Sequence, residues 1–272
     1  MRQMIVILAA WLFIGAMTAA QGQTLDPAAA AVAASRDALG GEKHLAAVKT
    51  LIATGRTRQV RGQNLAAIEF EIAIELPDKY MRKDEIPLQD GDPTTVGFNG
   101  DQLIQSVPEA DRLAQLSAVR QDFERLALGL FATASENFPL TFSFAGRAEA
   151  PEGQADVLDV AGPMGFSARL FLDARSHLPI MLSWQPPVAP QRGRGRGDAP
   201  PPNGAAARGN STQAVPAPVE SRLYFSDYRD VGGERLPFRL RRAVGSDTVE
   251  EMVFDGFKIN ARIDPRKFSS SK

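Results

Sequence analysis

The sequence of 272 residues contains no cysteine and only two histidines, His44 and His177. The missing cysteines exclude a disulfide scaffold, a lipidated cysteine, a thiolate metal site and a cysteine nucleophile. Histidine is the usual acid–base group near neutral pH, and neither histidine has a second one at ligand spacing. We therefore expect both histidines to lie on the surface and assign neither to catalysis.

The common sequence motifs of enzymes are also missing. There is no G-x-S-x-G elbow, no H-E-x-x-H pair, no phosphate-binding glycine loop and no dinucleotide-binding glycine triplet. Asp90-Gly91-Asp92 has the start of a calcium loop but not its later ligands, so it indicates a turn. The sequence predicts no catalytic residue, no metal and no cofactor, and therefore a protein that is not an enzyme. Carboxylates brought together only by folding remain an open alternative.

The charges are nearly balanced, with 31 Lys and Arg against 32 Asp and Glu. This balance gives no electrostatic reason to expect a nucleic acid as partner. The Arg-Gly repeat at residues 192–197 lacks the aromatic side chains that usually stack on single strands. We interpret it as a linker or as a segment that makes a transient contact with a membrane surface.

Residues 1–20 have the pattern of a secretory signal peptide. Arg2 precedes an apolar run from Met4 to Met17, and Thr18-Ala19-Ala20 supplies the small residues of a cleavage site. The run falls short of the roughly 20 apolar residues that span a bilayer. We expect cleavage near Ala20, and a mature protein at residues 21–272 that is periplasmic or secreted.

The stretch at residues 66–103 organises the rest of the chain. Ile68, Phe70, Ile72, Ile74 and Leu76 alternate with acidic or small residues, which is the period of a strand with one apolar face. A turn at residues 76–79, a returning strand at 80–83 and a turn at 91–93 follow. A hairpin around Asn99-Gly100 completes a predicted antiparallel meander.

The other predicted elements extend this pattern to both ends of the chain. Before the meander we expect a helix at residues 26–39, a short helix at 43–49 and a strand at 51–60. After it we expect an amphipathic helical region at residues 109–134, interrupted near Gly129. Further strands are predicted at 140–147, 156–160, 167–172, 179–184, 222–228, 236–244 and 249–257, with a last ordered piece at 263–268.

The predicted fold is therefore mainly β (α+β) and forms one domain. It is a strongly curved antiparallel sheet or half-open β-barrel, with an N-terminal helix and mid-chain lid helices. Residues 186–219 are rich in Pro, Gly, Ala and Arg and contain no aromatic residue. They predict a disordered insertion in that domain, because such a composition cannot offset its ordering entropy.

A curved sheet covered by helices can enclose an apolar cavity. The residues that we expect to line it are Phe70, Ile72, Ile74, Phe98, Leu116, Phe123 and Leu130. The alternative is an ordinary filled core, because a buried side chain contributes roughly 1.5–3 kcal/mol whether it touches a ligand or a helix. The apolar pattern does not separate these two structures.

The order of elements resembles the periplasmic outer-membrane lipoprotein carrier superfamily (LolA/LolB-like). The resemblance is carried by Leu76-Pro77-Asp78-Lys79-Tyr80-Met81-Arg82, by residues 98–108 and 230–237, and by a closing strand at 259–265. In the carriers an Arg precedes the proline of the first motif, whereas this chain has Leu76. The resemblance implies a hydrophobic cavity for lipid, acyl chain or lipoprotein cargo. A structural or envelope-sensing module with a filled core is the alternative, and the sequence does not fix an oligomeric state.

Overall fold

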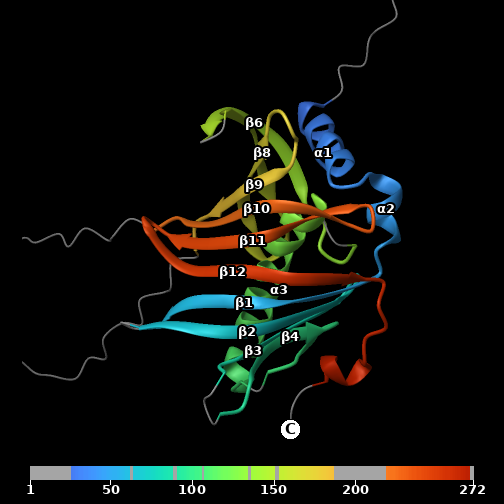
Figure 1. Cartoon of the computed structure of the whole chain (residues 1–272). Helices are drawn as coiled ribbons and strands as arrows, with labels where there is room; N and C mark the ends of the chain where they lie inside the picture. Colours follow the sequence, from blue (N-terminus) through green and yellow to red (C-terminus); the bar gives the residue numbers. More distant parts are fainter. Residues whose placement is uncertain are drawn as a thin grey trace, which may run out of the picture.

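The fold is a single open antiparallel sheet of twelve strands that curves around one long helix (Figure 1). The computed structural model describes residues 26–61, 64–87, 91–105, 107–133, 136–150, 153–186 and 219–269. In the sheet the strands lie in the order β5-β4-β3-β2-β1-β12-β11-β10-β9-β8-β7-β6. The chain therefore builds one half up to β5, crosses over with the helix, and returns through the other half until β12 pairs with β1. The predicted curved sheet is confirmed in this open form.

The helices and strands have the following bounds. The helices are α1 (Pro27–Ala38), α2 (Glu42–Ala47) and α3 (Glu109–Phe131), with short 3-10 turns η1 (Pro163–Gly165) and η2 (Pro265–Phe268). The strands are β1 (Thr50–Arg61), β2 (Asn64–Glu75), β3 (Lys79–Glu85), β4 (Thr94–Asn99), β5 (Gln102–Leu103), β6 (Thr141–Ala150), β7 (Gly153–Ala161), β8 (Ser167–Asp173), β9 (Pro179–Trp184), β10 (Ser221–Val231), β11 (Glu234–Val244) and β12 (Asp247–Ile259).

Helix α1 begins and ends where its sequence signals predict. The Asp26 side chain accepts a hydrogen bond from the backbone N–H of Ala28 at 3.0 Å, and Pro27 occupies the first helical position. Gly40 and Gly41 follow the helix with positive φ angles. The helix contacts β6, and Figure 1 shows it at that end of the sheet.

Strand β2 has the predicted two faces. Ile68, Phe70, Ile72 and Ile74 are all at most 4% exposed and belong to the concave side of the sheet. The convex side is not exposed to solvent along its whole length, because Ala73 is fully buried there in a small cluster separate from the main core. That part of the convex face is covered by the C-terminal segment.

The C-terminal segment crosses the convex face instead of continuing as a strand. Strand β12 ends at Ile259, and Asn260 then adopts a left-handed conformation with φ of 54°. Ile263 and Phe268 pack over Ala73 together with Met81 and Ile104 (the convex-face cluster). The expected closing strand at residues 259–265 therefore stops at its first residue.

Helix α3 is continuous through Gly129, so the predicted interruption is wrong. A Cβ atom at Gly129 would lie 2.0 Å from Cε1 of Phe225, so glycine is present to admit this ring. The helix ends at Ala132, whose φ is 47°. The glycine reflects close packing against β10.

The remaining expectations have mixed outcomes. The hairpin loop after β4 consists of Gly100 and Asp101, one residue later than predicted, because Asn99 pairs with Gln102.

The signal peptide and almost all of the insertion lie outside the described residues. Among the described residues, none of the helices has the length and apolar character needed to cross a membrane.

Candidate functional site

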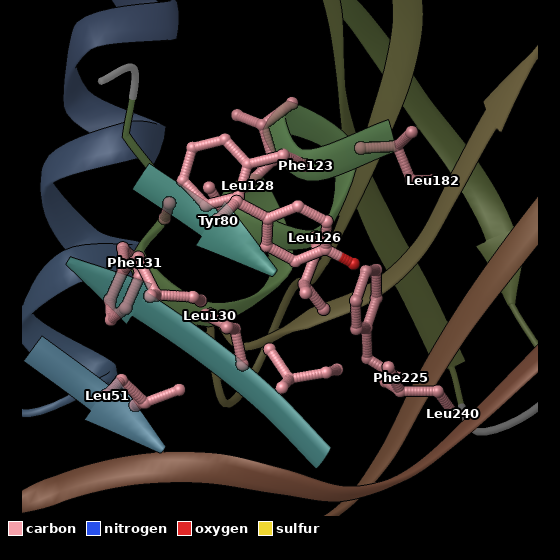
Figure 2. Close-up of a cluster of buried hydrophobic side chains, with 14 of the residues drawn as sticks. Leu51, Tyr80, Phe123, Leu126, Leu128, Leu130, Phe131, Leu182, Phe225 and Leu240 are labelled. Atoms are coloured by element: carbon pink, nitrogen blue, oxygen red, sulfur yellow. The ribbon is translucent and has the colours of Figure 1, made fainter. Parts of the chain in front are cut away.

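The concave side of the sheet and α3 bury most of the apolar side chains of the protein. Figure 2 shows Phe123, Leu126 and Tyr80 turned toward one another, with Phe225 and Leu240 approaching from β10 and β11. Tyr80 and Phe123 have ring centroids 5.3 Å apart, and Phe98 lies 5.5 Å from Phe123. This packing anchors the C-terminal half of α3, where residues 123–131 are all buried.

The seven residues predicted to line a cavity all lie in this apolar cluster. Their exposed fractions range from 0% for Ile74 to 9% for Leu116. Ile72 borders an open cavity on the concave face, and Phe70 borders a groove on the convex face. The other five (Ile74, Phe98, Leu116, Phe123 and Leu130) pack against other side chains in the cluster, and Phe98 also borders a small pocket of about 20 Å³ beside Arg120.

The concave-face cavity has a volume of about 360 Å³ and lies between α3 and both halves of the sheet. It is near the lower end of the range for ligand pockets, roughly 300–1,000 Å³. Its apolar lining comes from six strands of the two halves of the sheet and from the helix. These residues are Ile72, Tyr80, Val96, Val119, Leu126, Leu223, Leu240, Val249 and Met252, with Trp184 at one side.

One wall of the cavity carries a charged network centred on Arg82 (the Arg82 network). Arg82 donates to Glu250 Oε1 at 2.6 Å and to Asp84 Oδ1 at 2.7 Å. Thr57 and Gln59 also donate to Glu250 Oε1, at 3.1 and 3.0 Å. Although burial acts to raise the pKa of Glu250, the Arg82 guanidinium, the hydrogen bond from Gln59 and the charge of Arg242 hold it below its ordinary value. Arg82 is therefore matched by two carboxylates.

Beside this network, two guanidinium groups share one carboxylate (the Trp184 wall), and Arg242 of this group is the direct partner of Glu250 between β11 and β12. Asp122 Oδ1 accepts from Arg125 Nη1 at 2.9 Å and from Arg242 Nη2 at 3.0 Å. Both arginines also lie over the Trp184 ring, at 4.5 and 5.5 Å from its centroid. Burial lowers the pKa of the Arg125 guanidinium, Asp122 opposes this, and Arg242 lowers it further.

Burial also affects Tyr80, which lines the cavity beside the Arg82 network. Desolvation raises the pKa of the Tyr80 hydroxyl to about 12, which keeps it neutral at physiological pH. No cluster of three His, Cys, Asp or Glu suited to a metal is found in the described ranges. His44 is exposed as expected, whereas His177 is half-buried. The cavity can therefore enclose an apolar group and contact a polar one through charged side chains.

The charged walls were missed by the sequence analysis, although part of the signal was present. Tyr80, Arg82 and Asp84 alternate along β3, so they share the face on which Tyr80 is buried. Arg82 is the direct partner of Ile72 between β2 and β3. Asp122, Arg125 and Arg242 come from α3 and β11, and only the fold brings them together.

A larger groove of about 780 Å³ lies on the convex face, beside the C-terminal segment. Its charged lining mixes Arg56, Lys83, Arg266 and Lys267 with four carboxylates from the same face. Neither an excess of one charge nor a continuous apolar floor distinguishes this groove. We therefore place the candidate site in the concave-face cavity.

The curved open sheet with a helix against its concave face defines the fold class of the protein. The chain has the LolA-like fold: a LolA superfamily protein from Nitrosomonas europaea aligns over 88% of this chain and 96% of its own, with a TM-score of 0.53 and 11% identity. A DUF1329 family protein from Desulfovibrio piger covers 90% of this chain and 98% of its own, with a TM-score of 0.49 and 9% identity. A domain named for outer membrane lipoprotein sorting, from Vibrio parahaemolyticus, covers 80% and 88%, with a TM-score of 0.45 and 9% identity. No protein-family model and no curated protein matches the sequence.

Proposed function

We propose that the protein is an exported binding protein that holds hydrophobic cargo in the concave-face cavity. The cargo is a lipid, an acyl chain or a lipidated protein. The observation that carries this proposal is the cavity itself, open and largely apolar, between α3 and the strands around Ile72. The LolA-like fold supports the same reading at the level of architecture.

The proposed location is the periplasm or the exterior, because residues 1–20 read as a secretory signal peptide. In that compartment a carrier needs no cofactor and no metal, and it acts by sheltering apolar surface from water. The seven residues predicted to line the cavity would contact cargo to different extents. Ile72 would touch cargo in the present arrangement, whereas Phe123 and Leu130 would do so only if α3 moved away from the sheet.

The test is the binding of a neutral hydrophobic fluorophore, N-phenylnaphthylamine, to the mature protein. Wild type should bind it, and Ile72→Glu should abolish binding, because it places a carboxylate in the apolar floor. The new carboxylate would lie opposite Arg82, which limits its cost to folding. Glu69→Gln on the convex side of the same strand is the matched control and should bind normally. Unchanged binding by Ile72→Glu would place the probe elsewhere.

The second candidate function is a structural or envelope-sensing module with a filled interior. It is favoured by the burial of Ile74, Phe98, Leu116, Phe123 and Leu130 among the other side chains of the apolar cluster. On this reading wild type would bind no fluorophore. Ile72→Glu would then affect only the melting temperature.

A further inference from the structure

The charged side chains that line the concave-face cavity form one continuous series (the charged belt). Its first part is the Arg82 network, in which Arg82 pairs with Asp84 and Glu250. Arg242 continues the series, because it is the direct partner of Glu250 between β11 and β12 and also pairs with Asp122. Three guanidinium groups and three carboxylates therefore balance. In order along the belt the signs alternate through Asp84, Arg82, Glu250, Arg242, Asp122 and Arg125.

The belt is accessible mainly where Arg242 meets Asp122. Their side chains are 36% and 49% exposed, whereas those of Arg82 and Arg125 are 19% and 8% exposed. The buried Arg125 has protein partners, because it donates to Asp122 and to Gln121 Oε1 at 3.1 Å. A polar group that enters the cavity from solvent would therefore meet Arg242 and Asp122, a donor next to an acceptor.

From this arrangement we infer that the cavity binds a single-chain amphiphile with an uncharged, hydroxyl-bearing headgroup placed at Arg242 and Asp122. The inference rests on the proposed function and specifies its ligand. A hydroxyl group accepts a hydrogen bond from a guanidinium and donates one to a carboxylate, so it matches both neighbours at once. An ionic headgroup of either sign would attract one of them and repel the other. It would also leave a net charge in a site that is partly removed from water, which is costly.

The volume favours one chain over several. A water molecule takes about 30 Å³ of liquid, and a methylene group is of similar size, so about 360 Å³ holds roughly a dozen such groups. This corresponds to a dodecyl chain, which would lie along Ile72, Leu240 and Met252. The several chains of a lipoprotein anchor would need a wider opening between α3 and the sheet.

The experiment compares ligands with a twelve-carbon chain: monododecanoylglycerol, methyl dodecanoate, dodecanoate and dodecyltrimethylammonium. Each is used below its micelle-forming concentration to displace the neutral fluorophore from the mature protein. We expect the glycerol ester to bind about tenfold more tightly than the methyl ester, the size of one or two net hydrogen bonds. The methyl ester is the more hydrophobic of the two, so a purely apolar cavity would give the opposite order. Both ions should bind more weakly than the glycerol ester.

Two substitutions test the charge balance of the belt in opposite directions. Arg242→Gln leaves one carboxylate in excess, so it should strengthen binding of the cation and weaken binding of dodecanoate. Asp122→Asn leaves one guanidinium in excess and should do the reverse. Each change should shift the ratio of the two affinities by about tenfold, the effect of one charge-assisted hydrogen bond. Binding of methyl dodecanoate should stay the same in both variants.

The matched controls are Arg239→Gln and Glu251→Gln, which each remove one charge of an exposed ion pair on the convex side. Neither should change the ratio of the two affinities. The melting temperatures of the four variants, compared with that of wild type, show whether each is folded.

Tightest binding of the methyl ester, or of either ion, would overturn the headgroup assignment and leave the cavity proposal standing. An affinity ratio that stays the same in folded Arg242→Gln and Asp122→Asn would overturn the role of the belt in the same way. Failure of all four ligands and of the fluorophore to bind would overturn both proposals.

Discussion

Glu250 illustrates how a buried charge is held on the concave face. Its side chain is 10% exposed, and one of its oxygens accepts from Arg82, Thr57 and Gln59. An ionised carboxylate in this position is stable only while it is paired, because removing a charge from water is costly. The pKa of Glu250 is accordingly lower in the folded protein than its ordinary 4.5.

The lowered pKa of Glu250 gives a pH-dependent contribution to stability. A depressed folded-state pKa stabilises the protein above the ordinary value of 4.5, and this contribution is lost as the pH falls through the folded-state pKa. Glu250→Gln should therefore lower the free energy of unfolding at pH 7 by about 1–3 kcal/mol. Its difference from wild type should shrink progressively below pH 4.5. Urea unfolding across this range measures both, and a constant difference would contradict the assignment.

Gly129 is a second residue whose role can be tested alone. In an exposed helix Gly→Ala stabilises by roughly 1 kcal/mol. Here the new Cβ would lie 2.0 Å from the buried ring of Phe225, and overpacking costs about 1–3 kcal/mol. We expect Gly129→Ala to lower the melting temperature. Adding Phe225→Leu should recover part of the loss. A melting temperature above wild type would show that the ring moves freely.

Among the elements, those governed by local rules were predictable. The alternation in β2 and the capping by Asp26 depend on neighbours in sequence, and both are confirmed. The C-terminal segment was misread because its apolar residues, Ile263 and Phe268, pack on strands that lie far away in sequence. No local pattern distinguishes a strand from an extended segment that crosses a sheet.

The convex-face cluster gives a prediction for this segment. Phe268 is 2% exposed and covers Ala73 and Met81 together with Ile263. Phe268→Ala should lower the free energy of unfolding by about 3–5 kcal/mol, the usual result of truncating a buried phenylalanine. Arg262→Ala, at an exposed position of the same segment, should have little effect. Equal effects of the two changes in urea titrations would mean that the segment does not pack as described.

At the scale of the whole molecule, the sequence predicted the mainly β class and the curved sheet but not the character of the cavity. The apolar residues recur with strand and helix periods, so the cluster around Ile72 and Phe123 could be assigned. The pairing of β12 with β1 joins segments at opposite ends of the chain. Arg82 and Glu250 meet only through that pairing, because their strands are otherwise unrelated in sequence. The charged walls therefore required the structure.

The last prediction concerns residues 187–218. They separate β9 from β10 in the sequence, although these two strands are neighbours in the sheet. Strand β9 ends at Trp184 and β10 begins at Ser221, and these two residues are direct partners in an antiparallel pair. A short loop can join strands in this arrangement, and each halving of loop length changes the closure free energy by only about 0.6 kcal/mol.

Replacing residues 187–218 by a four-residue Gly-Asn-rich loop should therefore leave the melting temperature equal to or slightly above that of wild type. Trypsin should cut the native protein first at Arg192, Arg194, Arg196 or Arg208, and the shortened variant should resist at the same enzyme concentration. Arg241, in β11 over the ring of Tyr224, is an internal control that should stay uncut in both proteins. A clear fall in melting temperature on shortening would mean that these residues contribute to the folded domain. Since Trp184 lines the cavity, the fluorophore assay on the shortened variant shows whether binding depends on them.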